Sequence, residues 1–535
     1  MATILIDQRE VEIPDEPRLN AIEAARLAGI EIPHYCWHPG LSVAGSCRMC
    51  LIETGTRDPK TGDVSLMPKL VPACNTPAVD GVVIVTNSEK VQHARAMVEE
   101  RLLLNHPIDC PICDKAGECL LQDYHFEYGE DERRADIRPF TSRRRDVGDT
   151  VTLFVDRCIQ CSRCIRFTRE ITGTSELMLI NRGSHGEIDV MPDFPLQNNL
   201  SGNVVDLCPV GALGDKEFLY RQRVWFMQRH PGICTGCATG CSIWIEENQD
   251  RIHRLKPREN AEVNEWWICN EGRYGYPHVH NDSRLWEPRR REGGSVVPLD
   301  WTTLPAQLDE RLRGAGRLAA VLSPHLTVEE AYLLCQYIRQ LDGKAPLILG
   351  PVPVVGEDER FPGGFTISAE KCPNRRGVEQ VIAHFAGRVT TLDEFLPELA
   401  AGEIRGMWIS GGYKTDWIDA PTAERFGSLE LLVVQDLFAS PLSERAEYEL
   451  PGAAFAERDG SYVNRGDRLQ SARWAIRPPG SVRTEGSVFW ELLGRKGLYS
   501  ARAVLDEVAR EVSYFNAAAG PIPEVGIDMK VNLLA

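Results

Sequence analysis

The first residues of the chain alternate apolar and polar side chains in the pattern of two short strands. Apolar residues recur at every second position in ATILI and REVEI, and Asp7-Gln8 join the two runs as a turn. An alanine-rich stretch from Asn20 has the composition of a helix. Gly29 would close it, because glycine adopts the left-handed conformation common after helix ends. The pattern predicts a small α+β domain at the start of the chain.

A second helix is predicted between Thr86 and His106. Thr86 and Glu89 match a T-x-x-E capping box, and Pro107 disfavours helical backbone in the residue before it, so the helix should end at His106. Apolar residues at helical spacing form one face: Val91, Ala94, Val98 and Leu102. Such a helix would deliver the His106 imidazole just ahead of a cysteine-rich loop.

The second half of the chain alternates strand-like and helical runs. LAAVLS and PLILG have the composition of buried strands, and TVEEAYLLCQYIRQL between them has helical periodicity. GMWIS and LELLVV repeat the strand pattern farther on. Strands separated by helices are typical of a parallel sheet, so an α+β first half followed by an α/β second half is predicted.

Charge and hydropathy narrow the class of protein. The chain has 535 residues, with 60 Lys and Arg against 77 Asp and Glu and a formal charge of −17, which argues against strong binding to nucleic acid or to an anionic membrane surface. No apolar run is long enough for a transmembrane helix, and the acidic start does not resemble a signal peptide. We therefore expect a protein of a reducing, intracellular compartment.

The cysteines are concentrated in the first half of the chain. Of the 17 cysteines, all but Cys335 and Cys372 lie between Cys36 and Cys269. In a reducing compartment, closely spaced cysteines are more often metal ligands than disulfide partners. Cys335 and Cys372 are expected to be small buried side chains without a ligand role.

The first cysteine group has the outline of a [2Fe–2S] site. A lone cysteine, a C-x2-C pair and a distant fourth cysteine resemble the plant-type ferredoxin loop, and strand, strand, helix and cysteine loop is the order of a β-grasp ferredoxin. Gly45 and Ser46 are small enough to let backbone N–H groups approach sulfur atoms. A zinc site is the alternative, although zinc sites usually pair two C-x2-C knuckles. The members are Cys36, Cys47, Cys50 and Cys74.

The second group combines one histidine with three cysteines in NHPIDCPICDKAGEC. Three cysteines without a fourth nearby favour ligation by the histidine over its alternative role at a helix C-terminus or on the surface. A neutral imidazole in place of a thiolate makes a cluster less negative and therefore easier to reduce. The members are His106, Cys110, Cys113 and Cys119.

The third group has the C-x2-C-x2-C run with a remote C-P that is typical of bacterial [4Fe–4S] ferredoxins. Three thiolates at every third residue can bind around one corner of a cubane cluster. The alternative is a tetrahedral zinc site, which does not require that arrangement. The members are Cys158, Cys161, Cys164 and Cys208.

The fourth group lies in CTGCATGC and WWICNEGR. Glycines and threonines between the cysteines leave room for a cubane cluster, although a tetrahedral zinc site also suits this spacing. Its members are Cys234, Cys237, Cys241 and Cys269. The four groups together use every cysteine of this half of the chain, with one histidine completing four ligands for each centre.

These motifs closely resemble one family, the large iron–sulfur subunit of respiratory complex I, an NADH:quinone oxidoreductase. CWHPGLSVAGSCRMCLIE, LLLNHPIDCPICDKAGECLLQD, RCIQCSRCIRFTREITG and SGNVVDLCPVGAL carry the likeness. The resemblance implies one [2Fe–2S] cluster on the Cys36 group and one [4Fe–4S] cluster on each of the His106 and Cys158 groups. The Cys234 group resembles a further [4Fe–4S] site of some bacterial members, so three [4Fe–4S] clusters are expected.

The resemblance also implies a division into five domains. The first three are a β-grasp [2Fe–2S] ferredoxin domain at 1–85, a [4Fe–4S] domain with one histidine and three cysteine ligands at 86–150, and a ferredoxin-like [4Fe–4S] domain at 151–226. A [4Fe–4S] segment at 227–285 then opens a molybdopterin-oxidoreductase-like domain. The shortened α/β remainder of that domain occupies 286–535.

No molybdopterin is expected in the last domain. SRLWEPRRREGGSVVPLDW and ELPGAAFAERDGSYVNRGDRLQ look like parts of a molybdopterin-oxidoreductase domain, but the span available is well short of a full one. Glu271 stands where formate dehydrogenases and their kin carry a lysine, and the surroundings of Cys372 resemble complex I subunits. The resemblance therefore implies an α/β domain without an active site of its own.

The function implied by the resemblance is electron transfer within NADH:quinone oxidoreductase. The chain would carry single electrons from a flavoprotein subunit toward the quinone-reducing module. It contains no recognisable NADH, FMN or quinone site, so no catalytic residue and no organic-substrate site are expected on it. Expected partners are the NADH-oxidising flavoprotein and other peripheral-arm subunits, with no nucleic acid. Attachment to the cytoplasmic face of the inner membrane would be indirect.

Two alternatives remain open from the sequence. A diaphorase-type subunit of an NAD-linked hydrogenase or formate dehydrogenase shares the first three cluster motifs. A multi-zinc scaffold protein would use the same side chains to hold a different metal.

Overall fold

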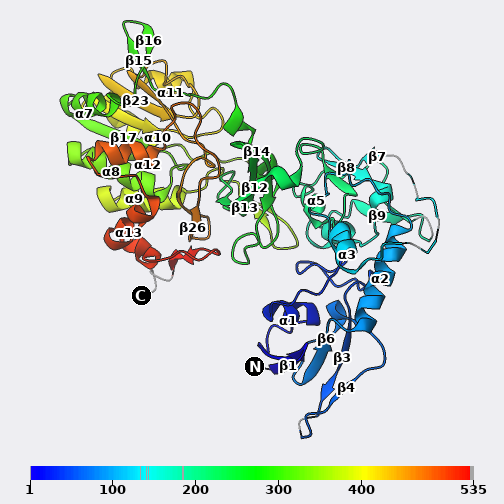
Figure 1. Cartoon of the computed structure of the whole chain (residues 1–535). Helices are drawn as coiled ribbons and strands as arrows, with labels where there is room; N and C mark the ends of the chain where they lie inside the picture. Colours follow the sequence, from blue (N-terminus) through cyan, green and yellow to red (C-terminus); the bar gives the residue numbers. More distant parts are fainter. Residues whose placement is uncertain are drawn as a thin grey trace. The chain divides into compact units, whose positions relative to one another are not determined.

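The structure, a computed structural model, describes residues 2–58, 60–132, 134–135, 137–139, 141, 144–183 and 186–530. It divides into two compact units, one formed by residues 1–227 with 361–364 and the other by residues 228–360 with 365–535. Each unit has its own sheets and its own core (Figure 1). Three of the predicted ligand groups belong to the first unit, and the Cys234 group belongs to the second.

The first unit begins with a six-stranded sheet that packs against one helix. The strand order is β2-β1-β6-β3-β4, with β5 paired to β3. β1 is antiparallel to β2 and parallel to β6. The elements are β1 (Ala2–Ile6), β2 (Arg9–Ile13), α1 (Ala21–Leu27), β3 (Leu51–Arg57), β4 (Val64–Leu66), β5 (Val71–Pro72) and β6 (Val82–Val85).

The turn and helix predicted for this domain are confirmed. Asp7 and Gln8 have φ angles of 44° and 69°, the left-handed values of a tight hairpin turn. Asn20 caps α1 by a capping box, in which its side chain accepts from the backbone N–H of Glu23 and the Glu23 carboxylate accepts from the backbone N–H of Asn20. Gly29, with φ of 71°, follows the helix as predicted.

The next helix, α2 (Glu89–Leu103), differs from its prediction at both ends. Ser88 caps it by accepting from the backbone N–H of Val91 at 3.3 Å, whereas the Thr86 hydroxyl is engaged in donating to the Asp7 carboxylate. The predicted capping box at Thr86 is therefore wrong. The helix also ends at Leu103, short of the predicted His106, so the imidazole is carried by the turn that follows.

The buried face of α2 is more polar than its sequence pattern predicts. Arg95 and Glu99 are buried, whereas the predicted Ala94, Val98 and Leu102 are only half-buried. The Arg95 guanidinium lies 4.9 Å from the centre of the Tyr128 ring, and the Glu99 carboxylate accepts from the Tyr35 hydroxyl. Aromatic side chains from outside the helix thus provide polar and π partners, which the periodicity of α2 alone cannot reveal.

The remainder of the first unit consists of short elements around the cysteine loops. β8 is the central strand of the sheet β11-β8-β7, and β9 and β10 pair as a hairpin. The elements are α3 (Leu120–Tyr128), β7 (Arg144–Asp146), β8 (Val151–Phe154), α4 (Arg163–Glu170), β9 (Leu177–Ile180), β10 (Glu187–Val190), α5 (Asn203–Leu207) and β11 (Leu213–Asp215).

The second unit is built on an eight-stranded sheet of order β16-β15-β24-β23-β22-β17-β18-β21. The strands from β24 to β21 are parallel, as the strand and helix alternation predicts, and the β15–β16 hairpin adds an antiparallel edge. The sheet strands are β15 (Arg289–Glu292), β16 (Ser295–Pro298), β17 (Leu318–Leu322), β18 (Leu347–Leu349), β21 (Thr390–Thr391), β22 (Gly406–Ser410), β23 (Leu431–Asp436) and β24 (Tyr448–Pro451).

Smaller sheets and helices complete the second unit. The sheet strands are β12 (Gln228–Ile233), β13 (Ser242–Asn248), β14 (Arg251–Pro257), β19 (Glu359–Arg360), β20 (Thr366–Ile367), β25 (Gly460–Val463), β26 (Arg468–Ala472) and β27 (Ile527–Asp528). The helices are α6 (Asn270–Tyr274), α7 (Leu304–Gly314), α8 (Val328–Leu341), α9 (Arg375–Ala386), α10 (Leu392–Ala400), α11 (Ala420–Glu424), α12 (Glu485–Leu492) and α13 (Ala501–Glu511).

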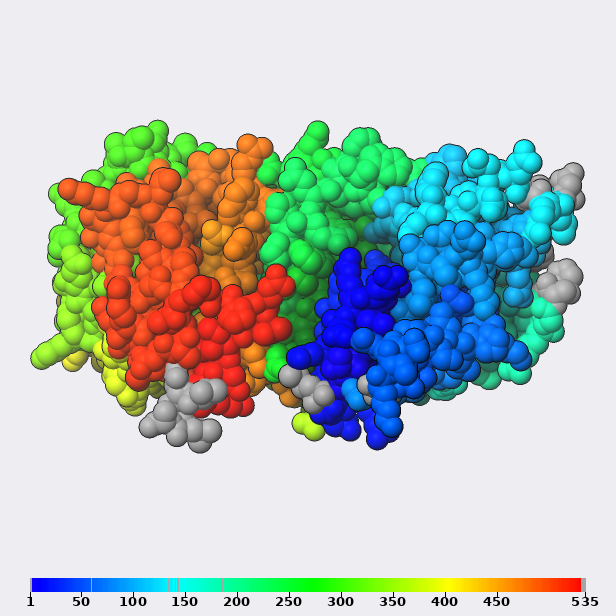
Figure 2. Space-filling view, turned by 60° about the horizontal axis from the view of Figure 1, so that its bottom comes forward, coloured from blue at the N-terminus to red at the C-terminus, as the bar shows by residue number. Residues whose placement is uncertain are grey.

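Helices cover both faces of the large sheet. Along β17, Ala320 and Leu322 face one core and Ala319 and Val321 the other, because successive strand side chains point to opposite faces. Helices α7, α8, α9, α12 and α13 fill the first core, and α10 and α11 contribute to the second. Figure 2 shows the C-terminal residues of this unit, drawn in red, at its surface.

The two cysteines outside the ligand groups are buried in the second unit, Cys335 on α8 and Cys372 just before α9. This agrees with their predicted role as small packed side chains. Within the described residues, none of the helices has both the length and the apolar character that a membrane span requires.

Candidate metal centres

The Cys36 group gathers within the β-grasp domain. Cys36 follows α1, Cys47 and Cys50 precede β3, and Cys74 lies in a short turn after β5. Side-chain hydrogen bonds link Cys36 to Cys47 and to Cys74, and Cys74 to Cys50. The backbone N–H groups of Ser46 and Cys47 also bond the Cys36 sulfur. All four predicted ligands are therefore neighbours, with N–H groups placed where the small residues before Cys47 predict them.

These contacts separate the four thiols into two kinds. Hydrogen bonds with Cys47 and Cys74 hold the pKa of the Cys36 thiol well below that of free cysteine, and a hydrogen bond with Cys74 lowers the pKa of Cys50. The pKa values of Cys47 and Cys74 are raised, first by their bonds to Cys36. The four side chains thus share their protons through these hydrogen bonds. Iron binding would displace the remaining protons, because a metal takes cysteine as thiolate.

The three cysteines of the second group occupy the loop between α2 and α3. Cys113 and Cys119 are buried and Cys110 is half-buried. Cys110 lies within electrostatic range of Cys113, and Cys113 lies within that range of Cys119. Burial raises the pKa of the Cys119 thiol to about 11. A thiolate at this position therefore needs positive charge of the kind that iron supplies.

His106 has the chemical properties of a metal ligand. Its Nδ1 atom is buried and has no hydrogen-bond partner among the described residues. Buried polar atoms are rarely left unpaired, so an orphan imidazole nitrogen beside a cysteine loop fits a metal site. Burial, followed by the charge of Arg157, lowers the pKa of His106 to about 4. The imidazole is therefore neutral at neutral pH, the form that binds metals.

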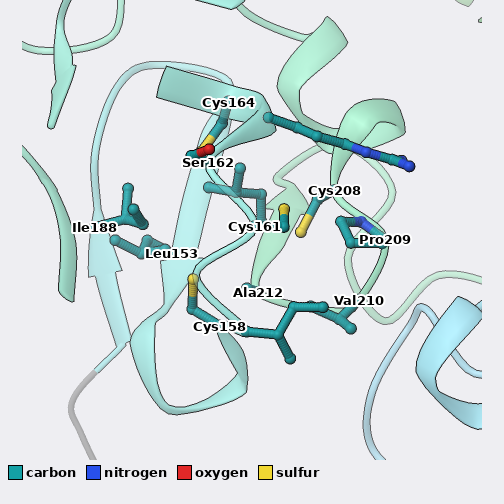
Figure 3. Close-up of a pocket in the computed structure, with 13 residues that line it drawn as sticks. Leu153, Cys158, Cys161, Ser162, Cys164, Ile188, Cys208, Pro209, Val210 and Ala212 are labelled. Atoms are coloured by element: carbon teal, nitrogen blue, oxygen red, sulfur yellow. The ribbon is translucent and has the colours of Figure 1, made fainter. Parts of the chain in front are cut away.

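The Cys158 group surrounds a pocket in the first unit. Figure 3 shows Cys158, Cys161, Cys164 and Cys208 around it, with apolar side chains such as Leu153 and Ile188 completing the wall. The backbone N–H of Gln160 donates to the Cys158 sulfur at 3.4 Å. Burial raises the pKa values of Cys158, Cys161 and Cys164. A pocket rimmed by four sulfurs fits a cluster, which spreads its ligands around several metal atoms.

The Cys234 group lies at one end of the sheet β12-β13-β14. Three of its cysteines fall between β12 and β13, and Cys269 caps α6, its sulfur accepting from the backbone N–H of Gly272 at 3.3 Å. Cys234, Cys237 and Cys269 all act electrostatically on Cys241, and all four are buried. The structure thus brings these four predicted ligands together as well. In the described part of the chain, no three His, Cys, Asp or Glu side chains are arranged to hold one metal ion.

Glycines stand where backbone passes close to these sulfur atoms. A Cβ atom on Gly211 would lie 2.1 Å from the Cys113 Sγ atom, and one on Gly272 would lie 3.0 Å from the Cys234 Sγ atom. Gly211 comes shortly after Cys208, so the loop of the third group packs directly on a cysteine of the second. Both glycines keep space around sulfur that any side chain would occupy.

Charged side chains that the sequence analysis missed lie beside two of the groups. Lys371 and Lys414 donate to the Glu271 carboxylate at 2.6 and 3.0 Å, and the charge of Lys371 acts on Cys237 and Cys269. Arg163, on α4, is buried between the loops of the Cys36 and Cys158 groups and bonds to both. The two lysines lie 100 and 143 residues from Glu271 along the chain, so no local signal could have identified them.

Five family models match consecutive parts of the chain. They are a 2Fe-2S iron–sulfur cluster binding domain at residues 1–89, the NADH-ubiquinone oxidoreductase-G iron–sulfur binding region at 95–134, the ferredoxin-like domain of NADH-quinone oxidoreductase subunit 3 at 148–214, a molybdopterin oxidoreductase Fe4S4 domain at 227–281 and a molybdopterin oxidoreductase domain at 354–495. The iron–sulfur models cover all four ligand groups.

Curated relatives carry names of the same complex. NADH-quinone oxidoreductase subunit 3 of Thermus thermophilus is 36% identical over 370 residues, covering 64% of this chain and 46% of the relative. The NADH-ubiquinone oxidoreductase 75 kDa subunit of Reclinomonas americana is 34% identical over 366 residues, covering 67% of this chain and 51% of the relative. The chain thus spans about half the length of the curated relatives it matches.

A solved structure also matches part of the chain. A chain of an NAD+-reducing [NiFe]-hydrogenase in the H2-reduced state is 28% identical, with a TM-score of 0.35, and the match covers 42% of this chain and 91% of that chain. The family models and the curated relatives together show that the chain is related to the large iron–sulfur subunit of NADH-quinone oxidoreductase, with an N-terminal 2Fe-2S domain, 4Fe-4S ferredoxin-like regions and a C-terminal molybdopterin-oxidoreductase domain.

Proposed function

We propose that this chain is an iron–sulfur electron-transfer subunit of an NADH:quinone oxidoreductase. It would take single electrons from a flavoprotein that oxidises NADH and pass them toward the quinone-reducing module. The observation that carries the proposal is the gathering of the predicted ligands into separate sulfur-rich centres within a chain whose relatives are subunits of that enzyme.

Each centre is assigned a cluster within this proposal. The Cys36 group would hold a [2Fe–2S] cluster, and the His106, Cys158 and Cys234 groups would each hold a [4Fe–4S] cluster. The orphan His106 nitrogen, the sulfur-rimmed pocket of the Cys158 group and the glycines beside Cys113 and Cys234 support this assignment. Molybdopterin is not part of the proposal.

When bound, iron–sulfur clusters supply reversible one-electron oxidation and reduction without proton transfer by the ligands. The residues of this chain set the conditions for that chemistry. Apolar walls around the Cys158 group exclude water, and backbone N–H groups at Ser46, Cys47 and Gly272 donate to sulfur atoms. Hydrogen bonds to sulfur stabilise added negative charge, so they favour the reduced state.

The organisation of the chain and its surroundings are proposed on the same basis. The predicted domains at 1–85, 86–150, 151–226, 227–285 and 286–535 would place the clusters in successive modules. The chain would bind the flavoprotein and other peripheral-arm subunits and reach the cytoplasmic face of the inner membrane only through them. No organic substrate would bind to this chain itself.

Metal and sulfide analysis of the purified full-length protein tests the cluster assignment. The proposal expects iron and acid-labile sulfide in the proportions of one [2Fe–2S] and three [4Fe–4S] clusters. Zinc without labile sulfide would establish the multi-zinc scaffold instead.

Isolation of the intact complex tests the physiological role. Low-temperature electron paramagnetic resonance (EPR) during titration with NADH should show the clusters becoming reduced, and electrons should reach a quinone. Copurification with a nickel or molybdenum subunit, with NAD-linked hydrogen or formate turnover and no quinone reduction, would contradict the proposal.

A further inference from the structure

Helix α4 places two buried arginines between the loops of two ligand groups. Arg163 and Arg166 flank Cys164 on this helix and are 7% and 4% exposed. Both lie in the first unit, where the Cys36 loop and the Cys158 loop meet. Their side chains leave the helix and reach backbone carbonyls of both loops.

Arg166 contacts one predicted ligand residue from each group. Its Nη2 atom donates to the carbonyl oxygen of Cys36 and, at 3.4 Å, to that of Cys161. Its Nη1 atom donates to the carbonyl oxygen of Ser42, farther along the first loop. A single planar guanidinium therefore fixes the backbone of the Cys36 group against the backbone of the Cys158 group.

Arg163 makes a parallel connection one turn earlier. Its Nη2 atom donates to the carbonyl oxygen of Trp37, next to Cys36, and its Nη1 atom donates at 3.2 Å to that of Leu207, next to Cys208. The two arginines thus bond to positions at or beside two members of the Cys158 group. Two planar guanidinium groups from one helix therefore hold the two loops together.

Within the part of the chain that the structure describes, the two guanidinium groups bond to neutral oxygen atoms only. Among the described residues, no Asp or Glu lies within ion-pair distance of Arg163 or Arg166, and their hydrogen bonds go to carbonyl oxygens and to the Ser162 hydroxyl. Buried charges are usually paired, because an isolated ion in the protein interior is costly. The Glu170 carboxylate of the same helix accepts from the backbone N–H and the hydroxyl of Ser42 and pairs with Arg169 instead.

Both positive charges lie at the ligand loops. The guanidinium of Arg166 donates to the carbonyl oxygens of Cys36 and Cys161, and that of Arg163 donates to the carbonyl oxygens next to Cys36 and Cys208. A cluster held by thiolates carries net negative charge, and reduction makes it more negative. A fixed buried cation near two such centres therefore favours the reduced state of each.

We infer that Arg163 and Arg166 are positioning residues for electron transfer between the Cys36 centre and the Cys158 centre. Their guanidinium groups hold the two centres at a fixed separation, and the positive charge of these groups makes both centres easier to reduce. The electron that leaves one centre arrives at the other, and the arginines neither lose a proton nor change a bond. The inference rests on the proposed function, since it requires clusters at both groups.

The test compares variants of the full-length protein in its intact complex by EPR-monitored redox titration. Arg166→Gln should shift the reduction equilibrium of both centres toward the oxidised state by roughly tenfold, which corresponds to a potential lower by about 59 mV. Arg163→Gln should act in the same direction. The signals of the His106 and Cys234 centres serve as internal references and should move much less.

The same helix offers a matched control. Arg169, 59% exposed at its side chain, makes none of the carbonyl contacts and pairs with Glu170, whose carboxylate is also held by the backbone N–H and the hydroxyl of Ser42. Arg169→Gln removes the same charge from α4 and should leave both potentials unchanged, because solvent screens an exposed charge. If Arg166→Gln titrates like Arg169→Gln at both centres, the inference is overturned.

A conservative variant separates the effect of the Arg166 charge from the effect of its hydrogen-bond geometry. It also keeps the inference testable if Arg166→Gln fails to retain its clusters. Arg166→Lys keeps the charge but cannot span both carbonyls, so the potentials should stay near wild type while the magnetic coupling between the two reduced centres changes. Unchanged coupling would refute the positioning role. If the wild-type protein itself holds no NADH-reducible clusters, the proposed function fails. If the wild-type clusters are reduced by NADH but the arginine variants have unchanged potentials, only the inference about the arginines is refuted.

Discussion

At the scale of single residues, the ability of a side chain to bind a metal depends on its burial and on whether its polar atoms already have hydrogen-bond partners. His106 shows this most clearly, since its buried Nδ1 atom is unpaired among the described residues and its ring is neutral at neutral pH. The sequence predicted a ligand role for this histidine only because three cysteines follow it without a fourth nearby. Lys371 and Lys414 have no cysteine motif next to them that would indicate a role, so only the folded structure shows that they contact Glu271.

Replacing His106 with cysteine should lower the reduction potential of its centre. A thiolate adds one negative charge to the cluster, so the reduced state becomes less favourable by at least roughly tenfold, or about 59 mV. EPR-monitored titration of His106→Cys measures the change. His93→Gln, a substitution of an exposed histidine on α2, is the control. A potential equal to or above that of wild type would rule out His106 as a ligand.

Replacing Lys371 with glutamine should lower the potential of the Cys234 centre. The ammonium lies 2.6 Å from the Glu271 carboxylate and acts on Cys237 and Cys269, so its loss leaves Glu271 with only Lys414 to balance it. We expect a severalfold shift of the equilibrium toward the oxidised centre. Titration of Lys371→Gln against the exposed variant Lys344→Gln checks it. An unchanged Cys234 signal would contradict this role for the lysine.

At the scale of elements, local signals predicted which helices form better than where they begin. Helix α8 forms where its periodicity predicts it, and a capping box of Thr327 and Glu330 begins it. The comparable pattern before α2 failed, because the Thr86 hydroxyl is engaged by Asp7, which lies 79 residues earlier in the chain. A tertiary hydrogen bond removed the expected cap, and Ser88 took the position.

The cap of α2 can be tested by substitution. Ser88→Ala removes the acceptor for the Val91 N–H and should destabilise the first turn of α2 by about 1 kcal/mol. Hydrogen exchange of the amides in that turn should accelerate severalfold. Ser88→Asp, which restores an acceptor and suits the helix N-terminus, should return exchange to wild-type rates. Faster exchange in Thr86→Ala than in Ser88→Ala would favour Thr86 as the cap.

At the scale of the whole molecule, loops that are distant in sequence build the centres together. Gly211, after Cys208, lies against Cys113, so the third ligand group limits the space around the second. In the second unit, the large parallel sheet and its two cores form as the alternation of strands and helices predicts. That unit also supplies Lys371 and Lys414 to its own ligand group.

Substituting Gly211 with alanine should damage the His106 centre. The added Cβ atom would lie 2.1 Å from the Cys113 Sγ atom, a distance that forces the sulfur or the backbone to move. We expect loss of most of the EPR signal of that centre and a matching fall in iron content. Gly314→Ala, where a Cβ meets nothing within 4 Å, should retain all clusters. Full cluster content in Gly211→Ala would show that the Cys113 sulfur can shift without cost.

The sequence by itself predicted the four groups of candidate ligands, and it determined the β-grasp start and the α/β second half. Cysteine spacing and the periodicity of apolar residues are local properties, which a chain displays without being folded. Only the tertiary structure decided the surroundings of each centre. Arg166 donates to the carbonyl oxygen of Cys36, which lies 130 residues earlier in the chain, and Arg95 and Glu99 are buried against aromatic partners. Such contacts depend on which distant segments pack together, because burial and electrostatic partners are set by proximity in space.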